Sequence, residues 1–359
     1  MTIEGTASAF PLKRSGIQVK DEHLQRVLQG EEFLLFDGGM GTMLQRAGLG
    51  AGELPDLLCL QNPDAITAIH RAYVEAGSQA VTTNTFGSNA RKLGDAATVD
   101  EVFAAAVRCA RTAGATYVAA DIGPIGELMA PMGELSFSEA YDLFAEQARA
   151  AEKAGADLVI VETMADTLEM VAAILGVVDS CALPLFATMT FTASGRTFLG
   201  AAPAEAALIM ALLGVDALGV NCSAGPADLQ PVVREMLRVA PSPVIVQANA
   251  GLPEVVDGVT TYTLPPADYA AAVVPMIEAG ASVVGGCCGT NPDYIREEAG
   301  LLTDRAVQPR SVDDGQALAL AREAADEGGR DGDIIALILE AADTAALKDA
   351  LIEEFDLDW

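Results

Sequence analysis

The stretch ADLVIVETMADTLEMVAAILGVVDSCALPLFATMT (residues 156–190) contains the pattern that repeats along this chain. Its first seven residues form a short run of apolar and β-branched side chains, which is typical of a strand buried on both faces of a parallel sheet. Residues 166–178 have the apolar spacing of a helix, and LPLFATMT (183–190) is again a strand. The stretch therefore predicts a strand, a crossover helix and a parallel strand.

The same alternation extends in both directions, from residue 33 to residue 302. The predicted strands are 33–37, 80–85, 116–121, 156–162, 183–190, 217–221, 243–249 and 282–286. The predicted helices are 63–77, 97–113, 137–154, 166–178, 203–213, 226–238, 267–279 and 292–302. Eight strand–helix units predict an α/β fold, namely a single (β/α)8 TIM barrel over residues 21–302.

A doubly wound parallel sheet is the alternative fold, because periodicity alone does not show that a sheet closes. The ends of the predicted strands favour the barrel. A polar or thiol side chain follows most of them: Asp37, Asn84, Asp121, Glu162, Cys222, Asn249 and Cys287. In a barrel these strand ends share one mouth, where catalytic groups gather.

The flanks of the barrel differ from it in composition. We expect residues 1–20 to form a flexible polar arm and residues 21–30 to form a short helix across the bottom of the barrel. Residues 303–359 predict an acidic linker followed by an amphipathic helical tail. The tail either packs its apolar face onto the barrel or docks a partner.

Charge and composition exclude several classes of protein. The formal net charge of −30, from 51 acidic and 21 basic residues, repels nucleic acids and anionic membranes. No apolar window is long enough for a membrane span, and the N-terminus lacks a signal-peptide pattern. Six cysteines in 359 residues are too few for a disulfide scaffold. We therefore expect a cytoplasmic protein with reduced thiols.

Three of the cysteines lie at predicted strand ends. Cys287 and Cys288 follow the eighth strand in VVGGCCGT (283–290), and Cys222 follows the sixth in GVNCS (219–223). Strands six and eight are near neighbours in a barrel, so the three thiolates can meet, and such a set selects Zn²⁺. A redox-active vicinal pair or two simple packing residues are the alternatives for Cys287 and Cys288.

A fourth protein ligand is not evident. The two histidines, His23 and His70, are predicted on helices away from the mouth, and Cys59, Cys109 and Cys181 are expected to be small buried apolar residues. An open fourth position is typical of catalytic zinc. With three thiolates the ion is a poor Lewis acid for carbonyls, but it can hold a substrate thiol as a nucleophilic thiolate. The expected reaction is alkyl transfer to sulfur.

A second group of candidate residues follows the first strand in FDGGMGT (36–42). Asp37 offers an anion for an ammonium group, and the adjacent glycines offer backbone N–H groups for a carboxylate. Together these describe the α-carbon end of an amino acid, and Glu162 is a second candidate for the same ammonium. The alternatives are a helix N-cap or a solvated loop acid for each carboxylate, and a phosphate site for the glycines.

Eight motifs between about residue 20 and residue 302 resemble the homocysteine S-methyltransferase family, and most closely the homocysteine-binding barrel of the cobalamin-dependent methionine synthases. The motifs are DGGMGTMLQ (37–45), TTNTFGSN (82–89), DIGPIGE (121–127), VIVETMADTLE (159–169), TFTASGRTFLG (190–200), GVNCSAGP (219–226), NAGLP (249–253) and GGCCGTNPDYI (285–295). Eight matches in the same order make the resemblance specific.

The resemblance implies a metal site and a reaction. Cys222, Cys287 and Cys288 would be the zinc ligands, and Asn249 would be a weak ligand that the substrate sulfur displaces. The implied activity is that of a zinc-dependent methyltransferase, which activates L-homocysteine as a zinc-bound thiolate and converts it to methionine.

The resemblance also implies a substrate pocket. Asp37 and Glu162 would bind the ammonium group of homocysteine, with the backbone of Gly38 and Gly39 near its carboxylate. It places two asparagines in the same pocket, Asn84 and Asn221.

The sequence departs from the family on the C-terminal side of the barrel. It contains no DxHxxG-type cobalamin motif and no second barrel. We therefore expect methylcobalamin or another methylcorrinoid, carried on a separate protein, as the donor. Free methylcobalamin and a different donor are the alternatives. Other interpretations remain. The chain could methylate a different thiol, or it could be a demethylase that transfers a methyl group from a methylthio compound to a corrinoid partner. It could also be a binding subunit whose zinc is structural.

Overall fold

The computed structural model describes residues 1–3, 10, 12, 14–48, 54–256 and 259–356. Eight parallel strands form one sheet in the order β3-β12-β9-β8-β7-β6-β5-β4. Their bounds are β3 (Leu34–Leu35), β4 (Ala80–Thr82), β5 (Tyr117–Ile122), β6 (Leu158–Met164), β7 (Leu185–Met189), β8 (Ala217–Asn221), β9 (Val244–Ala248) and β12 (Ala281–Gly286). Gln79 bridges the two ends of the sheet, because its N–H donates to Leu35 O at 2.8 Å and its Oε1 accepts from Leu35 N at 2.9 Å. The sheet is a nearly closed barrel, as predicted.

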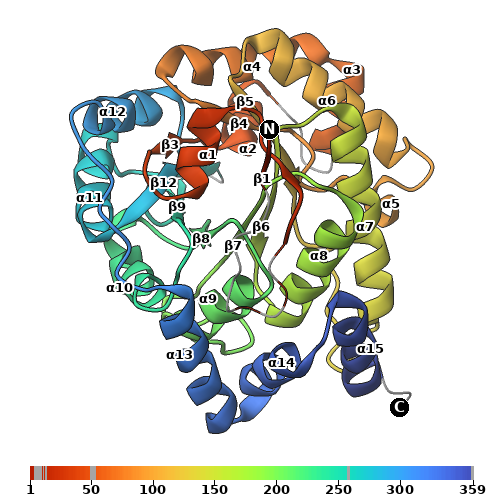
Figure 1. Cartoon of the computed structure of the whole chain (residues 1–359). Helices are drawn as coiled ribbons and strands as arrows, with labels where there is room; N and C mark the ends of the chain where they lie inside the picture. Colours follow the sequence, from red (N-terminus) through yellow and green to blue (C-terminus); the bar gives the residue numbers. More distant parts are fainter. Residues whose placement is uncertain (4–9, 11, 13, 49–53, 257–258, 357–359) are drawn as a thin grey trace.

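A ring of helices surrounds the barrel (Figure 1). The eight that follow the barrel strands are α4 (Pro63–Ala76), α6 (Val99–Ala113), α7 (Phe137–Ala154), α8 (Thr167–Ser180), α9 (Pro203–Leu212), α10 (Pro226–Leu237), α11 (Pro266–Ala279) and α12 (Pro292–Leu302). All eight predicted strands and helices are confirmed. Local signals fix several helix ends: Thr98 and Glu101 form a capping box at the start of α6, and Gly155 ends α7 in the left-handed conformation.

The strand ends at the mouth carry further elements that the sequence did not predict. They are α2 (Met40–Arg46), η1 (Pro55–Leu57), α3 (Leu58–Gln61), α5 (Ala90–Leu93) and a hairpin of β10 (Glu254–Val256) and β11 (Val259–Thr261). Because loops at the carboxyl ends of barrel strands surround the mouth, these elements build its wall.

The barrel interior is filled by apolar side chains from alternate strand positions, among them Phe36, Tyr117 and Phe186. The predicted bottom helix is α1 (Glu22–Leu28), and its Leu24 and Val27 are fully buried in this interior cluster. Figure 1 shows α1 lying across one end of the barrel. The bottom is therefore closed, and only the opposite end offers an entrance.

Those residues of the predicted N-terminal arm that the structure describes pack at the bottom of the barrel. β1 (Thr2–Ile3) pairs with β2 (Ile17–Gln18) in an antiparallel ladder. Val19 is 1% exposed and belongs to the interior cluster. The rest of the arm, at 4–9, 11 and 13, lies outside the described residues.

The tail forms three helices that lie outside α7, α8 and α9 (Figure 1). They are α13 (Asp314–Glu327), α14 (Gly329–Glu340) and α15 (Thr344–Phe355). Apolar side chains of the tail, such as Ile334, Ile338 and Leu351, are fully buried. Asp356 accepts hydrogen bonds from Phe137 N at 2.6 Å and from the next backbone N–H at 3.1 Å, and so caps α7. The apolar face of the tail is therefore part of the fold.

Within the described residues, no helix is both long and apolar enough to span a membrane.

Candidate functional site

The three predicted cysteine ligands meet at the mouth. Cys222 directly follows β8, and Cys287 and Cys288 directly follow β12, with β9 between the two strands. The three sulfur atoms lie within 4.8 Å of one another, and those of Cys222 and Cys288 are 3.4 Å apart. All three residues are half-buried. Three converging thiols of this kind fit a soft divalent ion such as Zn²⁺.

Backbone hydrogen bonds between neighbouring loops fix the cysteines in place. Cys222 N donates to Gln247 O at 3.2 Å, and Cys287 N donates to Ala248 O at 2.8 Å. Cys288 O accepts from Ala250 N at 2.9 Å. The ends of β8, β9 and β12 are thus linked through the residues that carry the thiols. The sulfur positions are set by the sheet rather than by flexible loops.

The thiols also influence each other's protonation. Hydrogen bonds from Cys222 and Cys287, and a further one from the Tyr262 phenol, hold the pKa of Cys288 below its usual range. The pKa of Cys222 is lowered by its hydrogen bond with Cys287 but raised on balance by its hydrogen bond with Cys288 and by burial, and hydrogen bonds with the other two thiols, together with burial, raise the pKa of Cys287. A thiolate is the form that binds a metal, so the cluster already favours one metal-binding anion. Sequence reasoning missed Tyr262, which follows the β10–β11 hairpin.

Asn249, the predicted weak ligand, follows β9. Its side chain is 5% exposed, and its Oδ1 has no hydrogen-bond partner among the described residues. A buried carbonyl oxygen without a hydrogen-bond partner costs folding free energy. The site therefore favours a bound group, such as a metal ion, that interacts with the lone pair of this oxygen. The thiol set and this free oxygen together are compatible with a Zn²⁺ site that has an exchangeable fourth position.

Asn221 is the last residue of β8 and is fully buried. Its Nδ2 donates to Glu162 Oε2 at 2.5 Å and to Thr163 Oγ1 at 2.8 Å, while its Oδ1 accepts from Thr163 N and Thr188 Oγ1, both at 2.9 Å. Thr163 and Cys222 both have positive φ, 61° and 47°. Such backbone strain outside glycine is characteristic of functional sites.

A buried acidic pocket lies beside the thiols. Asp37 accepts from Thr82 N at 2.9 Å and from Thr82 Oγ1 at 2.8 Å. Burial raises the pKa of Asp37 to about 7, and it also raises that of Glu162 to about 7. Burial and then the charge of Glu162 raise the pKa of Asp121 well above its usual range. These acids form a polar, poorly solvated group, called the acidic pocket below, that a cation would stabilise.

The two glycines after Asp37 have a packing role that the sequence did not reveal. A Cβ on Gly38 would lie 2.6 Å from Thr290 Oγ1, and one on Gly39 would lie 2.7 Å from Cys287 O. We expected the N–H of Gly39 to lie near a substrate carboxylate. It instead donates to Thr290 Oγ1 at 3.1 Å and so already has a partner. The glycines let the Asp37 loop approach the cysteine turn closely.

Other predicted residues lie away from the thiols. Asn84 Nδ2 donates to Pro55 O at 2.7 Å and so holds η1 in place. Cys59, Cys109 and Cys181 are buried, as expected for small apolar residues. The histidines are on α1 and α4, away from the strand ends that carry the thiols.

Sequence reasoning did not assign a role to two further polar residues, Asp121 and Gln247. Both are buried and both have a side-chain oxygen without a partner among the described residues. Each is the last inward position of its strand by period-two alternation, and that position is the signal that could have identified them.

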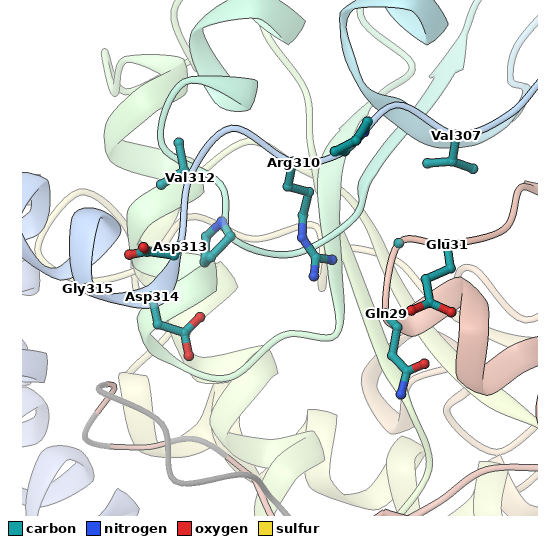
Figure 2. Close-up of a pocket in the computed structure, with 11 residues that line it drawn as sticks. Gln29, Glu31, Val307, Arg310, Val312, Asp313, Asp314 and Gly315 are labelled. Carbon is teal, nitrogen blue, oxygen red and sulfur yellow. The ribbon is translucent and has the colours of Figure 1, made fainter.

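A hollow of about 820 Å³ lies at the opposite end of the molecule (Figure 2). Gln29, Glu31 and Pro241, from segments that lead into the strands, line it together with residues of the linker and of the first turn of α13. Figure 2 shows Arg310 and two acids, Asp313 and Asp314, around it. This hollow is separate from the mouth and contains no thiol.

Comparison with known families identifies the barrel. A family model described as homocysteine S-methyltransferase matches residues 34–301, which include β3 to α12 and all three thiols. The chain belongs to this family.

Relatives within the homocysteine S-methyltransferase family include two mycobacterial proteins. Methionine synthase of Mycobacterium tuberculosis is 37% identical over 311 residues, covering 80% of this chain and 26% of the relative. Methionine synthase of Mycobacterium leprae is 37% identical over 298 residues, covering 77% and 24%. The chain thus spans about a quarter of the length of these relatives.

Solved structures of the family share the fold. The homocysteine methyltransferase MmuM from Escherichia coli, in its oxidized form, superposes with a TM-score of 0.67 at 20% identity, covering 78% of this chain and all of MmuM. Its metallated form superposes with a TM-score of 0.64 at 22% identity. The barrel architecture is therefore common to both proteins.

Proposed function

We propose that this chain is a zinc-dependent methyltransferase that takes L-homocysteine to methionine. The observation that carries the proposal is the position of three half-buried thiols, within 4.8 Å of one another, at the mouth of a barrel of the homocysteine S-methyltransferase family. Cys222, Cys287 and Cys288 would hold the ion, and Asn249 Oδ1 would take the exchangeable fourth position. When bound, Zn²⁺ supplies a soft Lewis acid that lowers the pKa of a substrate thiol.

The protein's own residues would orient the amino acid. Asp37 and Glu162 would accept hydrogen bonds from its ammonium group, on the side of the pocket next to the thiols. Asn221 would hold Glu162 in position, since its Nδ2 lies 2.5 Å from Glu162 Oε2. Burial of this pocket strengthens each of these charge interactions relative to water.

We further propose that the methyl group comes from methylcobalamin or another methylcorrinoid on a separate protein. The relatives named methionine synthase support the formation of methionine, and the resemblance of the motifs to the cobalamin-dependent branch of the family supports a corrinoid donor. Loops at the mouth also carry apolar side chains that are exposed, which is the kind of surface a bulky donor needs. They are Phe86, Leu128, Met132, Phe198 and Leu252.

The function can be tested by titrating the zinc-loaded protein with L-homocysteine in weak buffer near pH 7. We expect close to one proton released per zinc, because the thiol binds as thiolate. Homoserine, which has a hydroxyl in place of the thiol, should release none. Absence of both binding and proton release would contradict homocysteine as the substrate. In Cys288→Ser, zinc binding equal to that of the wild type would contradict the metal site.

A further inference from the structure

Alternate residues of each barrel strand point inward, and those nearest the mouth form a polar ring above the apolar interior. In β5 and β6 the interior cluster includes Ala119 and Ile160. Asp121 and Glu162 lie two residues further along these strands and therefore share the inward direction. The two strands are neighbours in the sheet. Asp121 thus enters the same pocket as Glu162.

The Asp121 carboxyl is held in place but is only partly satisfied. Its backbone is fixed by hydrogen bonds from Thr83 Oγ1 to Asp121 N, at 3.0 Å, and from Thr85 Oγ1 to Asp121 O, at 2.7 Å. Its side chain shares a hydrogen bond with Glu162. The Oδ1 atom is buried without a partner among the described residues, although Asp121 is only 5% exposed. A rigid, buried, unpaired acceptor favours a ligand that donates to it.

The pocket also lacks a counter-ion. Asp37, Asp121 and Glu162 are all buried or half-buried, and in the part of the chain that the structure describes none of the three forms an ion pair with a basic side chain. Neighbouring buried carboxyls repel one another when charged. A ligand with a positive group would relieve this repulsion, whereas a neutral ligand would not.

We propose that Asp121 is a specificity-determining residue, whose free Oδ1 accepts a hydrogen bond from the α-ammonium of the thiol substrate. The inference rests on the proposed function and adds a third acid to Asp37 and Glu162. It makes the pocket selective for thiols that carry an α-amino group. A thiol acid without the amino group gains nothing from Asp121.

The experiment compares two thiols on the zinc-loaded full chain by calorimetry: L-homocysteine and 4-mercaptobutanoate, which lacks the amino group. The variant is Asp121→Ala, which removes the accepting oxygen. Asp121→Asn is the conservative variant, because its amide can donate to Glu162 while its amide oxygen still accepts. Asp179→Ala is the matched control, because it removes one carboxyl group on the outer face, at a residue that accepts hydrogen bonds from Tyr141 and Thr344. Zinc content verifies the fold, and Asp121→Ser replaces the first variant if that one does not fold.

We expect Asp121→Ala to weaken homocysteine binding by about 10- to 100-fold, as for the loss of a hydrogen bond to a charged group, whereas Asp121→Asn should bind it much as the wild type does. Binding of 4-mercaptobutanoate should be unchanged, and Asp179→Ala should match the wild type. Equal losses for both thiols would show a merely structural role and overturn the proposal, as would no loss for either. A wild type that binds neither thiol would overturn the proposed function as well.

Discussion

Asn221 Nδ2 lies 2.5 Å from Glu162 Oε2, and the same nitrogen is 4.0 Å from the sulfur of Cys287. One buried amide therefore contacts both the acidic pocket and the cysteine cluster. Its Oδ1 also accepts from the backbone N–H of Thr163, one of the two non-glycine residues with positive φ among those described. The position of the thiols and the position of the acid are consequently coupled through Asn221.

Replacing Asn221 with Ala should weaken metal binding and substrate binding together. We expect about a 10-fold loss of zinc affinity, which is typical for removal of a residue that supports metal ligands. Competition with a chromophoric chelator measures the zinc affinity, and calorimetry measures homocysteine binding. Glu162→Gln is the control, since it should weaken homocysteine binding alone. An unchanged zinc affinity in Asn221→Ala would argue against the coupling.

Gly39→Ala should also lower zinc affinity, by about 10-fold or more, because the new Cβ would lie 2.7 Å from Cys287 O and would displace that residue. Gly41→Ala is the matched control, since a Cβ there meets nothing within 4 Å. The same chelator competition applies to both variants. If the two bound zinc equally, the close approach of the Asp37 loop would not control the metal site.

Ile338→Ala in α14 should lower the free energy of unfolding by about 2 to 4 kcal/mol, because a fully buried side chain is truncated. Asp333→Ala, an exposed position on the same helix, should change it by about 0.5 kcal/mol or less. Chemical denaturation measures both. Equal stabilities would mean that the tail does not contribute to the fold in solution.

Glu298 in α12 should make stability depend on pH. Neither carboxyl oxygen has a hydrogen-bond partner among the described residues, and burial raises the pKa from its ordinary value of 4.5 to about 8. The folded state binds this proton more tightly than the unfolded state. The contribution to stability is therefore present below about pH 4.5 and is lost as the pH rises through about 8.

Glu298→Gln cannot ionise and should remove this contribution. Relative to the variant, the wild type should lose about 3 kcal/mol of unfolding free energy between pH 5 and pH 8. Urea denaturation at the two pH values measures the difference. Parallel pH profiles for the two proteins would show that Glu298 is solvated or paired in solution.

The sequence predicted the barrel and the meeting of the thiols because both depend on regular periodicity. Buried runs with intervening helices define the strands, and a residue that directly follows a strand of a closed barrel must lie at the mouth. This places Cys222 beside Cys287 and Cys288 without knowledge of any contact. The tail was predicted in the same way, from its amphipathic spacing, although its place outside α7 to α9 was not.

Contacts between distant segments were not predictable from the pattern. The glycines at 38 and 39 have one role in an isolated loop and another when a cysteine turn packs against them. Asn84 follows a strand, as a pocket residue would, but its amide turns to Pro55. Asp121 was recognised as a residue at a strand end, yet its unpaired oxygen depends on which neighbours face it in the folded chain.

The closure of the barrel bottom by Leu24 and Val27 has a kinetic consequence. A barrel closed at one end has a single entrance, so in the proposed reaction the amino acid and the methyl donor would use it in turn. A donor that covered the mouth would trap whatever lies below it. Homocysteine would therefore have to enter first and methionine would leave after the spent donor has withdrawn, which would make the proposed reaction compulsorily ordered.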